Sequence, residues 1–125
     1  MSKKIIHTDN APKAVGPYVQ AIDTGKLLFT SGQLGIDPMT GKLLEGVEAQ
    51  AEQSMKNVGA ILKEVGADFK DAVKCTIFVQ DMNDFAAVNK IYESFFDGNF
   101  PARSCVQVAK LPLGGLVEIE CIAQL

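Results

Sequence analysis

A single arginine interrupts a stretch of sequence that otherwise predicts a buried strand. Arg103 lies in NFPARSCVQV, residues 99–108, and carries a permanent positive charge. A guanidinium group in a partly buried strand needs a partner, because burying an unpaired charge is costly. One candidate partner is internal, since AKLPLGG would form a hairpin that brings Glu118 or Glu120 near Arg103. The other is the carboxylate of a small ligand, which arginine binds through two parallel hydrogen bonds, and the residues alone favour neither.

Two acidic residues, Glu118 and Glu120, occupy alternate positions of the last predicted strand. Alternate residues of a strand share a face, and their Cβ atoms lie about 6.5–7 Å apart. Burying both carboxylates in ionised form is costly because like charges repel. We therefore expect one of them to meet solvent or another subunit and the other to serve as a working acid or base. The alternative is that both form salt bridges in an interface.

Two short motifs could contribute to a binding site. TSGQLGID, residues 30–37, contains Gly32 and Gly35, whose lack of a Cβ lets backbone N–H and C=O groups approach a ligand. A strand-end turn uses glycine for the same steric reason, so this signal is weak. In GPYVQA, Tyr18 follows a Gly-Pro corner, and its position favours a core aromatic residue over a hydroxyl group at a pocket rim.

Several chemistries are disfavoured by what the chain lacks. The only histidine, His7, lies near the N-terminus, away from any pattern typical of a nucleophilic triad. The sequence has no motif with metal-ligand spacing, no P-loop and no GxGxxG, so we expect neither a metal nor a nucleotide cofactor. Cys75, Cys105 and Cys121 are widely spaced in apolar contexts, which predicts reduced core residues rather than disulfides.

The composition indicates an ordinary globular protein with one domain, residues 1–125. The net charge is −3 and the lysines are scattered, which disfavours a nucleic-acid surface because such surfaces are basic. The longest apolar runs are far shorter than the roughly 20 residues of a membrane span, and the N-terminus has no signal-peptide core. We therefore expect a soluble, cytoplasmic protein that binds neither nucleic acid nor membrane.

Two helices and about six strands are predicted to position these residues. Apolar residues recur at helical spacing between Gly46 and Gly66, and a second apolar face runs from Asp84, a potential N-cap, to Phe96. Composition or period-two alternation predicts strands in KKIIH, YVQAID, KLLFTSG, AVKCTIFVQD, RSCVQVA and LVEIECIAQL. Elements in this order predict an α+β sandwich in which both helices pack on one face of the sheet.

The other sheet face carries a mixture of apolar and charged side chains. Alternation places Val73, Cys75, Ile77 and Val79 on one face. The opposite face then holds Thr76, Phe78, Arg103, Cys105, Glu118, Glu120 and Ile122. That mixture is too apolar to be fully solvated and too charged for a closed core. We infer an oligomer interface containing a polar pocket; the alternative is a solvated face with scattered apolar residues.

Five stretches of the chain together resemble the Rid family of YjgF type, specifically its RidA archetype of imine deaminases. They are NAPKAVGPYVQAI, LLFTSGQLGIDPMTG, DFAAVNKIYESFF, FPARSCVQVAKLP and VEIECIA, in the family's order and spacing. The resemblance implies a chorismate-mutase-like fold of the bacillus type, with a six-stranded mixed sheet, and a homotrimer with a central β-barrel and active sites at the subunit interfaces. It also implies hydrolysis of 2-iminobutanoate and 2-iminopropanoate, released by pyridoxal-phosphate enzymes, to 2-keto acids and ammonia without a cofactor.

The resemblance further implies roles for individual residues. Arg103 would pair with the substrate carboxylate, and the backbone N–H of Cys105 would help to hold that group. Glu118 would position the attacking water, whereas Glu120 matches a structural acid. Gly32 would offer its backbone carbonyl to the imine nitrogen. The matched pocket positions are Tyr18, Ser31, Gly32 and Asn89.

One connection departs from the archetype. Leu113, Gly114 and Gly115 stand where the archetype often has charged residues, which affects the pocket rim and the preference for a substrate side chain. Three alternatives to the deaminase stay open. The family has also been linked to endoribonuclease or translation-inhibitor activity and to chaperone-like holdase binding, and the same arginine could serve a regulator that binds keto acids without turnover.

Overall fold

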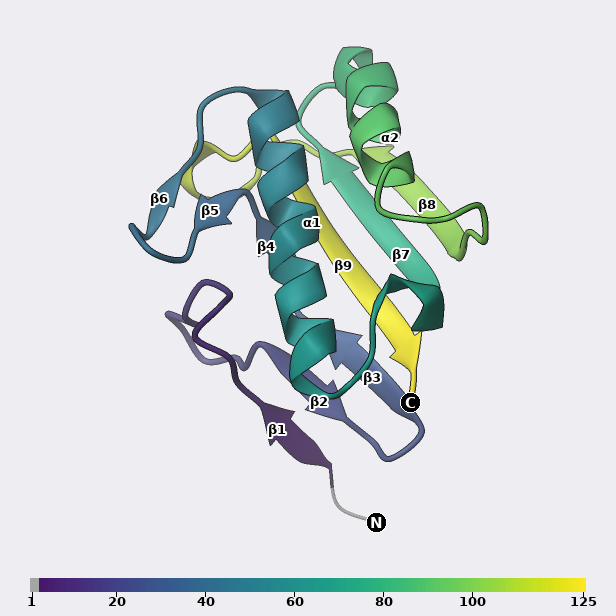
Figure 1. Ribbon diagram of the computed structural model, residues 1–125. Helices are drawn as coiled ribbons and strands as arrows, with labels where there is room; N and C mark the ends of the chain where they lie inside the picture. Colours follow the sequence, from purple (N-terminus) through teal and green to yellow (C-terminus); the bar gives the residue numbers. More distant parts are fainter. Residues whose placement is uncertain (1–2) are drawn as a thin grey trace.

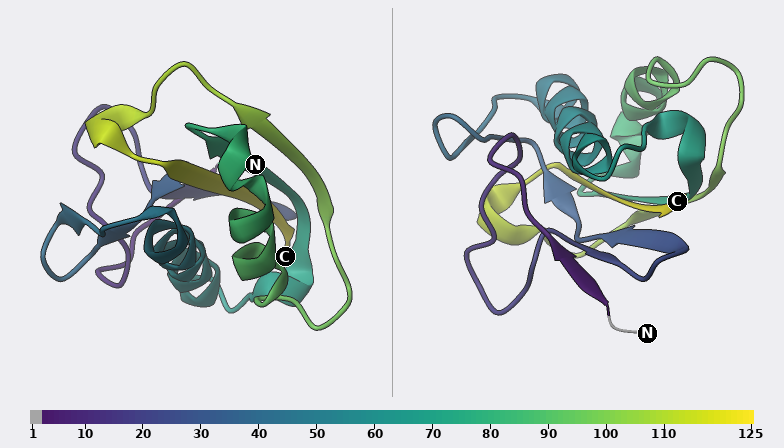
Figure 2. Two further views of the ribbon diagram at one scale, coloured as in Figure 1. Left: turned by 90° about the horizontal axis from the view of Figure 1, so that it is seen from above. Right: turned by 60° about the horizontal axis from the view of Figure 1, so that its bottom comes forward.

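A computed structural model describes residues 3–125 as a mixed sheet with two helices packed on one face (Figures 1 and 2). The strand order is β1-β2-β3-β9-β7-β8, with β4 also paired to β9, and β5 and β6 form a separate hairpin. The helices are α1, Val47–Glu64, and α2, Phe85–Glu93. The strands are β1 Lys4–Ile6, β2 Ala21–Asp23, β3 Leu27–Thr30, β4 Gln33–Leu34, β5 Ile36–Asp37, β6 Lys42–Leu43, β7 Ala72–Val79, β8 Ala102–Gln107 and β9 Val117–Gln124.

Helix α1 forms the centre of the core and confirms the first predicted helix. It begins after Gly46, whose φ of 87° suits glycine, and ends just before Gly66, whose φ is 76°. Its apolar stripe is completely buried: Ala51, Met55, Val58, Ile61 and Leu62 each have 0% exposure. Burying one large aliphatic side chain of this kind contributes roughly 1.5–3 kcal/mol relative to leaving it exposed. The helical period of these residues therefore determines which face of α1 packs on the sheet.

Helix α2 is shorter than predicted and is not capped as expected. Its regular part ends at Glu93, and residues 94–96 continue in tighter turns through backbone bonds back to residues 90–93. Asp84 makes no side-chain cap; instead the Asp81 carboxylate accepts the Asn83 N–H and caps the preceding 3₁₀ turn. The chain enters α2 directly from that turn, so the capping position lies three residues earlier than predicted. Among residues 3–125, no helix combines the length and apolar character that crossing a bilayer would require.

Strands β1, β2 and β3 agree with the prediction from sequence more closely than the segment that follows β3. The edge strand β1 and the hairpin of β2 and β3 form at the expected places, but β2 includes only Ala21–Asp23 of the predicted YVQAID, and β3 only Leu27–Thr30 of KLLFTSG. Three two-residue strands, β4 to β6, were not predicted, and the main sheet has seven strands rather than six. Both β3 and β4 pair with β9, so they act as one strand interrupted at Ser31 and Gly32. Just before this gap, at the end of β3, the Thr30 hydroxyl accepts the Cys121 backbone N–H at 3.0 Å.

Strand β8 runs parallel to β7 and does not form the predicted hairpin with β9. Helix α2 connects β7 to β8, and a parallel pair requires such a crossover. In the register of the pair, Arg103 is opposite Cys75 and Cys105 is opposite Ile77. Arg103 and Cys105 therefore lie on the helix side of the sheet. The prediction that they share a face with Glu118 and Glu120 is wrong.

The alternation predicted for β7 holds for all but one residue. Cys75, Ile77 and Val79 are buried against the helices, whereas Val73 is 40% exposed. A bulge between Ala72 and Lys74 shifts the pairing of β7 with β9 at this point. An extra residue in one strand reverses the side-chain phase, which removes Val73 from the buried face.

Candidate functional site

Helix α2 holds the guanidinium group of Arg103 in a fixed orientation. Arg103 Nη1 donates a hydrogen bond to Asn89 Oδ1 at 2.6 Å. The guanidinium carbon lies 5.5 Å from the ring centre of Phe85 and 5.1 Å from that of Tyr92, both within the range of a cation–π contact. Residues 85, 89 and 92 have the i, i+4, i+7 spacing of one helical face. One stripe of α2 thus positions the cation through two aromatic rings and one amide oxygen.

The partner of Arg103 within the chain is an amide, not an acid. Among residues 3–125, no carboxylate lies within 4 Å of the guanidinium group, so of the two partners that the sequence left open, the internal one, Glu118 or Glu120, is excluded within one chain. The side chain is half-buried and lines an open cavity of about 340 Å³ together with Asn89, Tyr92, Glu93, Phe100 and Pro101. A guanidinium group has five N–H donors, and Asn89 uses one of them. The arginine retains the donors needed to bind an anion.

None of the three cysteines combines an accessible thiol with a lowered pKa. Cys105, on β8 two residues after Arg103, is half-buried, and burial raises the pKa of its thiol although the charge of Arg103 acts in the opposite direction. Cys75 and Cys121 lie opposite each other on β7 and β9 and are free and buried. Hydrogen bonding between these two thiols lowers the pKa of Cys75 and raises that of Cys121. The sequence predicted reduced core cysteines: Cys75 and Cys121 are free and buried as expected, whereas Cys105 is free but only half-buried.

Glu118 lies directly against Gly32. A Cβ on Gly32 would overlap the Glu118 carboxylate oxygen Oε2 and lie 2.7 Å from Cδ, so position 32 admits glycine alone without moving the acid. The pairing of β4 with β9 brings the two residues together, because Leu34 is opposite Glu118. Burial raises the pKa of Glu118, and the neighbouring charge of Glu120 raises it further. The carboxyl group is therefore easier to protonate than an ordinary glutamate.

Glu118 lines a groove of about 990 Å³, together with Tyr18, Ser31 and Gly32. Tyr18 is 49% exposed, so its predicted place in the core is wrong. A tight turn, in which the Tyr18 N–H bonds to the Gly16 carbonyl at 2.8 Å, directs the chain outward at this point. Ser31 donates its hydroxyl hydrogen to the Val19 carbonyl at 2.6 Å, which ties the interruption of β3 and β4 to the preceding segment.

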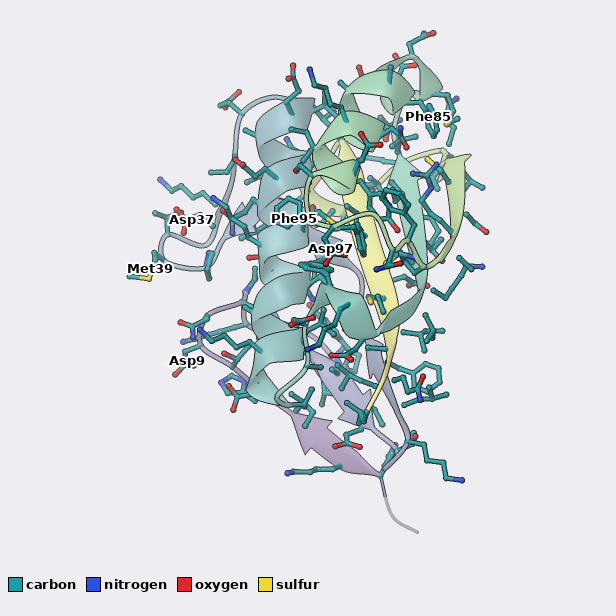
Figure 3. All side chains as sticks on the ribbon, turned by 45° about the vertical axis from the view of Figure 1, so that its right-hand side comes forward. Asp9, Asp37, Met39, Phe85, Phe95 and Asp97 are labelled. Atoms are coloured by element: carbon teal, nitrogen blue, oxygen red, sulfur yellow. The ribbon has the colours of Figure 1, made fainter. Side chains whose placement is uncertain are left out.

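The predicted site residues fall into two groups that do not meet within one chain. We call Arg103, Asn89 and Cys105 the arginine cluster, and Glu118, Gly32, Ser31 and Tyr18 the glutamate cluster. Strand β7 separates β8 from β9, and the two clusters use opposite faces of the sheet. In Figure 3, Phe85 marks the side of the arginine cluster and Met39, at the groove of the glutamate cluster, projects on the far side of α1.

Sequence reasoning missed two residues that shape the arginine cluster, Phe85 and Tyr92. Their helical spacing had assigned them to an apolar core face. Tyr92 is indeed 4% exposed, and burial raises the pKa of its hydroxyl well above the ordinary value. Their contact with Arg103 could have been inferred from the helical spacing of these two aromatic residues around Asn89. Within residues 3–125, no three histidine, cysteine or acidic side chains gather where they could hold a metal ion.

The chain is similar to known proteins both in sequence and in fold. Residues 8–125 match the protein family described as endoribonuclease L-PSP. The 2-iminobutanoate/2-iminopropanoate deaminase of Salmonella typhimurium is 54% identical over 123 residues, which span 96% of each chain. The crystal structure of E. coli TdcF with bound serine has a TM-score of 0.95 at 48% identity and 98% coverage of both chains. The crystal structure of the E. coli YjgF gene product has a TM-score of 0.94 at 52% identity and covers 97% of this chain and 98% of that one.

Proposed function

The chain belongs to the endoribonuclease L-PSP family, which is the YjgF/Rid family, and we propose that it hydrolyses 2-imino acids to 2-keto acids and ammonia. The relatives named as 2-iminobutanoate/2-iminopropanoate deaminases include that of Salmonella typhimurium and one from Mus musculus, which is 50% identical over 122 residues. The observation that carries the proposal is the Glu118 carboxyl group, held against Gly32 with a raised pKa at the edge of a groove.

The proposed reaction needs a positioned water and a group that exchanges protons. Water adds to the imine carbon of R–C(=NH)–COO⁻ and passes a proton to the nitrogen, which forms a carbinolamine. The C–N bond then breaks, ammonia leaves, and the hydroxyl group loses a proton to give R–C(=O)–COO⁻. Orientation of the reactants can contribute several kcal/mol, and general acid–base catalysis typically contributes about 10²- to 10⁴-fold in rate.

Glu118 is the proposed catalytic acid and base. A carboxyl group with a raised pKa takes up and releases protons closer to neutral pH than an ordinary glutamate does. The missing Cβ of Gly32 lets the Glu118 carboxylate lie directly against the backbone at residue 32. The backbone carbonyl of Gly32 is proposed to hold the substrate nitrogen beside this acid. Tyr18 and Ser31 line the same groove, and Glu120 has a structural role that includes raising the pKa of Glu118.

Arg103 is the proposed binding group for the substrate carboxylate. Its free N–H donors suit the bidentate geometry of a carboxylate, and Asn89 sets the orientation of the guanidinium plane. The backbone N–H of Cys105 is proposed to supply an additional donor. The Cys105 thiol takes no part in this scheme, because its raised pKa keeps it neutral.

The separation of the two clusters supports a site built between copies of the chain. Neighbouring strands lie about 4.8 Å apart, so β8 and β9 are about 10 Å apart, and their site residues also point to opposite faces. A substrate of a few carbon atoms does not span that distance through the sheet. We therefore propose a homotrimer with a central β-barrel, in which the arginine cluster of one subunit faces the glutamate cluster of the next.

The proposed substrates are the reactive products of pyridoxal-phosphate-dependent dehydratases. These enzymes release enamines of small amino acids, which convert to 2-iminobutanoate or 2-iminopropanoate. Rapid hydrolysis in the cytoplasm would limit the damage that these compounds cause.

A coupled assay tests this function directly. Threonine dehydratase converts threonine to the imine while semicarbazide traps whatever imine remains free, and the rate of trapping is followed with and without this protein. We expect the protein to suppress trapping and Arg103→Ala to abolish the suppression. Unchanged trapping in the presence of the wild-type protein, or native activity in Arg103→Ala, would refute the proposal.

The description of the family as endoribonucleases makes RNA cleavage the second candidate. The observations favour it less, because the only histidine, His7, is exposed and bonded to Asp9 at 3.0 Å, and the net charge of −3 repels a polyanion. Incubation with a labelled single-stranded RNA at low salt separates the two functions. Cleavage that persists in Glu118→Gln would assign the RNase activity to another site.

A further inference from the structure

Leu113 combines two properties that are unfavourable for an isolated chain. Its φ of 59° makes it the one residue other than glycine with a positive φ among residues 3–125, and its side chain is 75% exposed. Leucine has no polar side chain to compensate for the left-handed conformation, and an exposed aliphatic group gains nothing from water. Local strain of this kind clusters at functional sites.

The loop that carries Leu113 is anchored on both sides. Leu111 is buried, and the N–H of Leu116 donates to Gln50 Oε1 at 2.8 Å. Gly115 lies so close to Leu34 that a Cβ would come within 2.8 Å of the leucine Cδ2. The exposed position of Leu113 is therefore set by a packed loop.

Leu113 lies on the apolar wall of the groove that contains Glu118. Leu34, Ile36, Met39 and Pro112 are among the other apolar side chains that line this groove. The groove of about 990 Å³ is several times larger than a four-carbon acid. Its apolar wall matches an aliphatic group better than a polar one, because burying apolar surface against apolar surface is favourable.

We infer that Leu113 contacts the side chain of the substrate and gives the enzyme a preference for 2-imino acids with long or branched aliphatic side chains. The inference rests on the proposed deaminase function. With the carboxylate bound to Arg103 of another copy and C2 next to Glu118, the side chain on C2 extends into the rest of the groove. The wall made by Leu113 and Leu34 then receives it, and the strain at Leu113 serves to present the aliphatic group there.

Two imines of different size test this role. An L-amino-acid oxidase produces 2-imino-4-methylpentanoate from leucine and 2-iminopropanoate from alanine, and semicarbazide trapping gives kcat/KM for each. In Leu113→Asn we expect the ratio of the larger to the smaller substrate to fall about 10-fold, since a methylene group in an apolar pocket changes selectivity by this order. Asparagine tolerates a positive φ, so the loop keeps its shape.

Two further variants complete the design. Leu113→Gly removes the side chain at a backbone conformation that glycine favours, and the same fall in the ratio is expected. Met82→Asn makes the same change in polarity at another exposed apolar residue, 40% exposed and outside the groove, and should leave the ratio unchanged.

The outcomes separate this inference from the proposed function. If the wild type hydrolyses 2-iminopropanoate but both Leu113 variants keep the wild-type ratio, the selectivity role is wrong and the deaminase function stands. An equal loss for the two imines would likewise overturn the selectivity role. If the wild type hydrolyses neither imine, the proposed function fails and this inference fails with it.

Discussion

The arginine cluster and the glutamate cluster are built by opposite means. Arg103 is surrounded by groups that stabilise its charge, namely the faces of Phe85 and Tyr92 and the amide oxygen of Asn89. Glu118 is instead surrounded by groups that destabilise its charge, because burial and Glu120 both raise its pKa. A site that must hold a carboxylate benefits from a fixed cation, whereas a site that must move protons benefits from a carboxyl group that does not remain ionised.

The glutamate cluster also has a cost in folding stability that depends on pH. The raised pKa of Glu118 means that the folded chain binds a proton more readily than the unfolded chain does. The free energy of unfolding therefore decreases as the pH rises from the ordinary glutamate value of 4.5 through the raised pKa of the folded state. The glutamate cluster lowers stability at neutral pH, as is common where catalysis and stability compete.

The largest expected effect comes from neutralising the carboxyl group of Glu118, the proposed catalytic acid and base. Glu118→Gln keeps the shape of the side chain but removes proton transfer, so we expect kcat to fall about 10²- to 10⁴-fold with little change in KM. Steady-state kinetics with 2-iminobutanoate measure both constants. A variant with near-native kcat would show that the glutamate cluster contributes no proton transfer.

Mixing two inactive variants sharpens the same prediction. If each site takes Arg103 from one copy and Glu118 from the next, refolding Arg103→Ala together with Glu118→Gln restores about one quarter of the sites in a random mixture. The two variants kept apart and then combined without refolding provide the control. Activity that never returns after verified subunit exchange would place both residues in sites within single chains.

A smaller effect is expected from loosening the arginine cluster. Phe85→Leu removes one aromatic face from the guanidinium group, which lies 5.5 Å from the ring centre. A cation–π contact contributes about 0.5–2 kcal/mol, so KM should rise about 2- to 30-fold while kcat changes little. Phe85→Tyr retains the aromatic face and should restore the native KM. Equal losses in both variants would indicate that Phe85 acts through packing rather than through the cation.

The smallest expected effect is a shift in pH dependence. Glu120→Gln removes the negative charge that helps to raise the pKa of Glu118, so that pKa should fall. The acidic limb of the kcat/KM profile, which reports Glu118 in the free enzyme, should move to lower pH. The decrease in unfolding free energy between pH 4.5 and neutral pH should also become smaller. A limb that stays in place would mean that another group controls activity at acidic pH.

The sequence predicted the parts of the molecule whose pattern has a clear period. Helix α1 and the buried residues of β7 follow from the repeat of large apolar residues, and each agrees with the structure. In β8, neither of the two sets of alternate residues is uniformly apolar, so the pattern does not show which set is buried. One set is Ala102, Ser104 and Val106, and the other is Arg103, Cys105 and Gln107. The choice of face therefore depends on long-range pairing with β7, which the local sequence does not contain.

The same limit applies to the site. Strands of two residues, such as β4, have no detectable period, so the contact between Gly32 and Glu118 arises from pairing across more than 80 residues of sequence. The bulge at Val73 and the missing cap at Asp84 depend on neighbouring backbone in the same way. The family resemblance identified the residues of both clusters but did not indicate that one chain keeps them apart.

The interruption between β3 and β4 bears on how such a protein changes over evolutionary time. Glu118 belongs to a continuous strand held by β7 on one side and β4 on the other, whereas Gly32 lies in the interruption that follows Thr30, whose hydroxyl accepts the Cys121 backbone N–H. The groove wall is supplied by turns outside this framework, including the β5–β6 hairpin and the loop at Leu113. A lineage can therefore vary or exchange these turns and acquire new substrate preferences while the carboxyl group of Glu118 keeps its position.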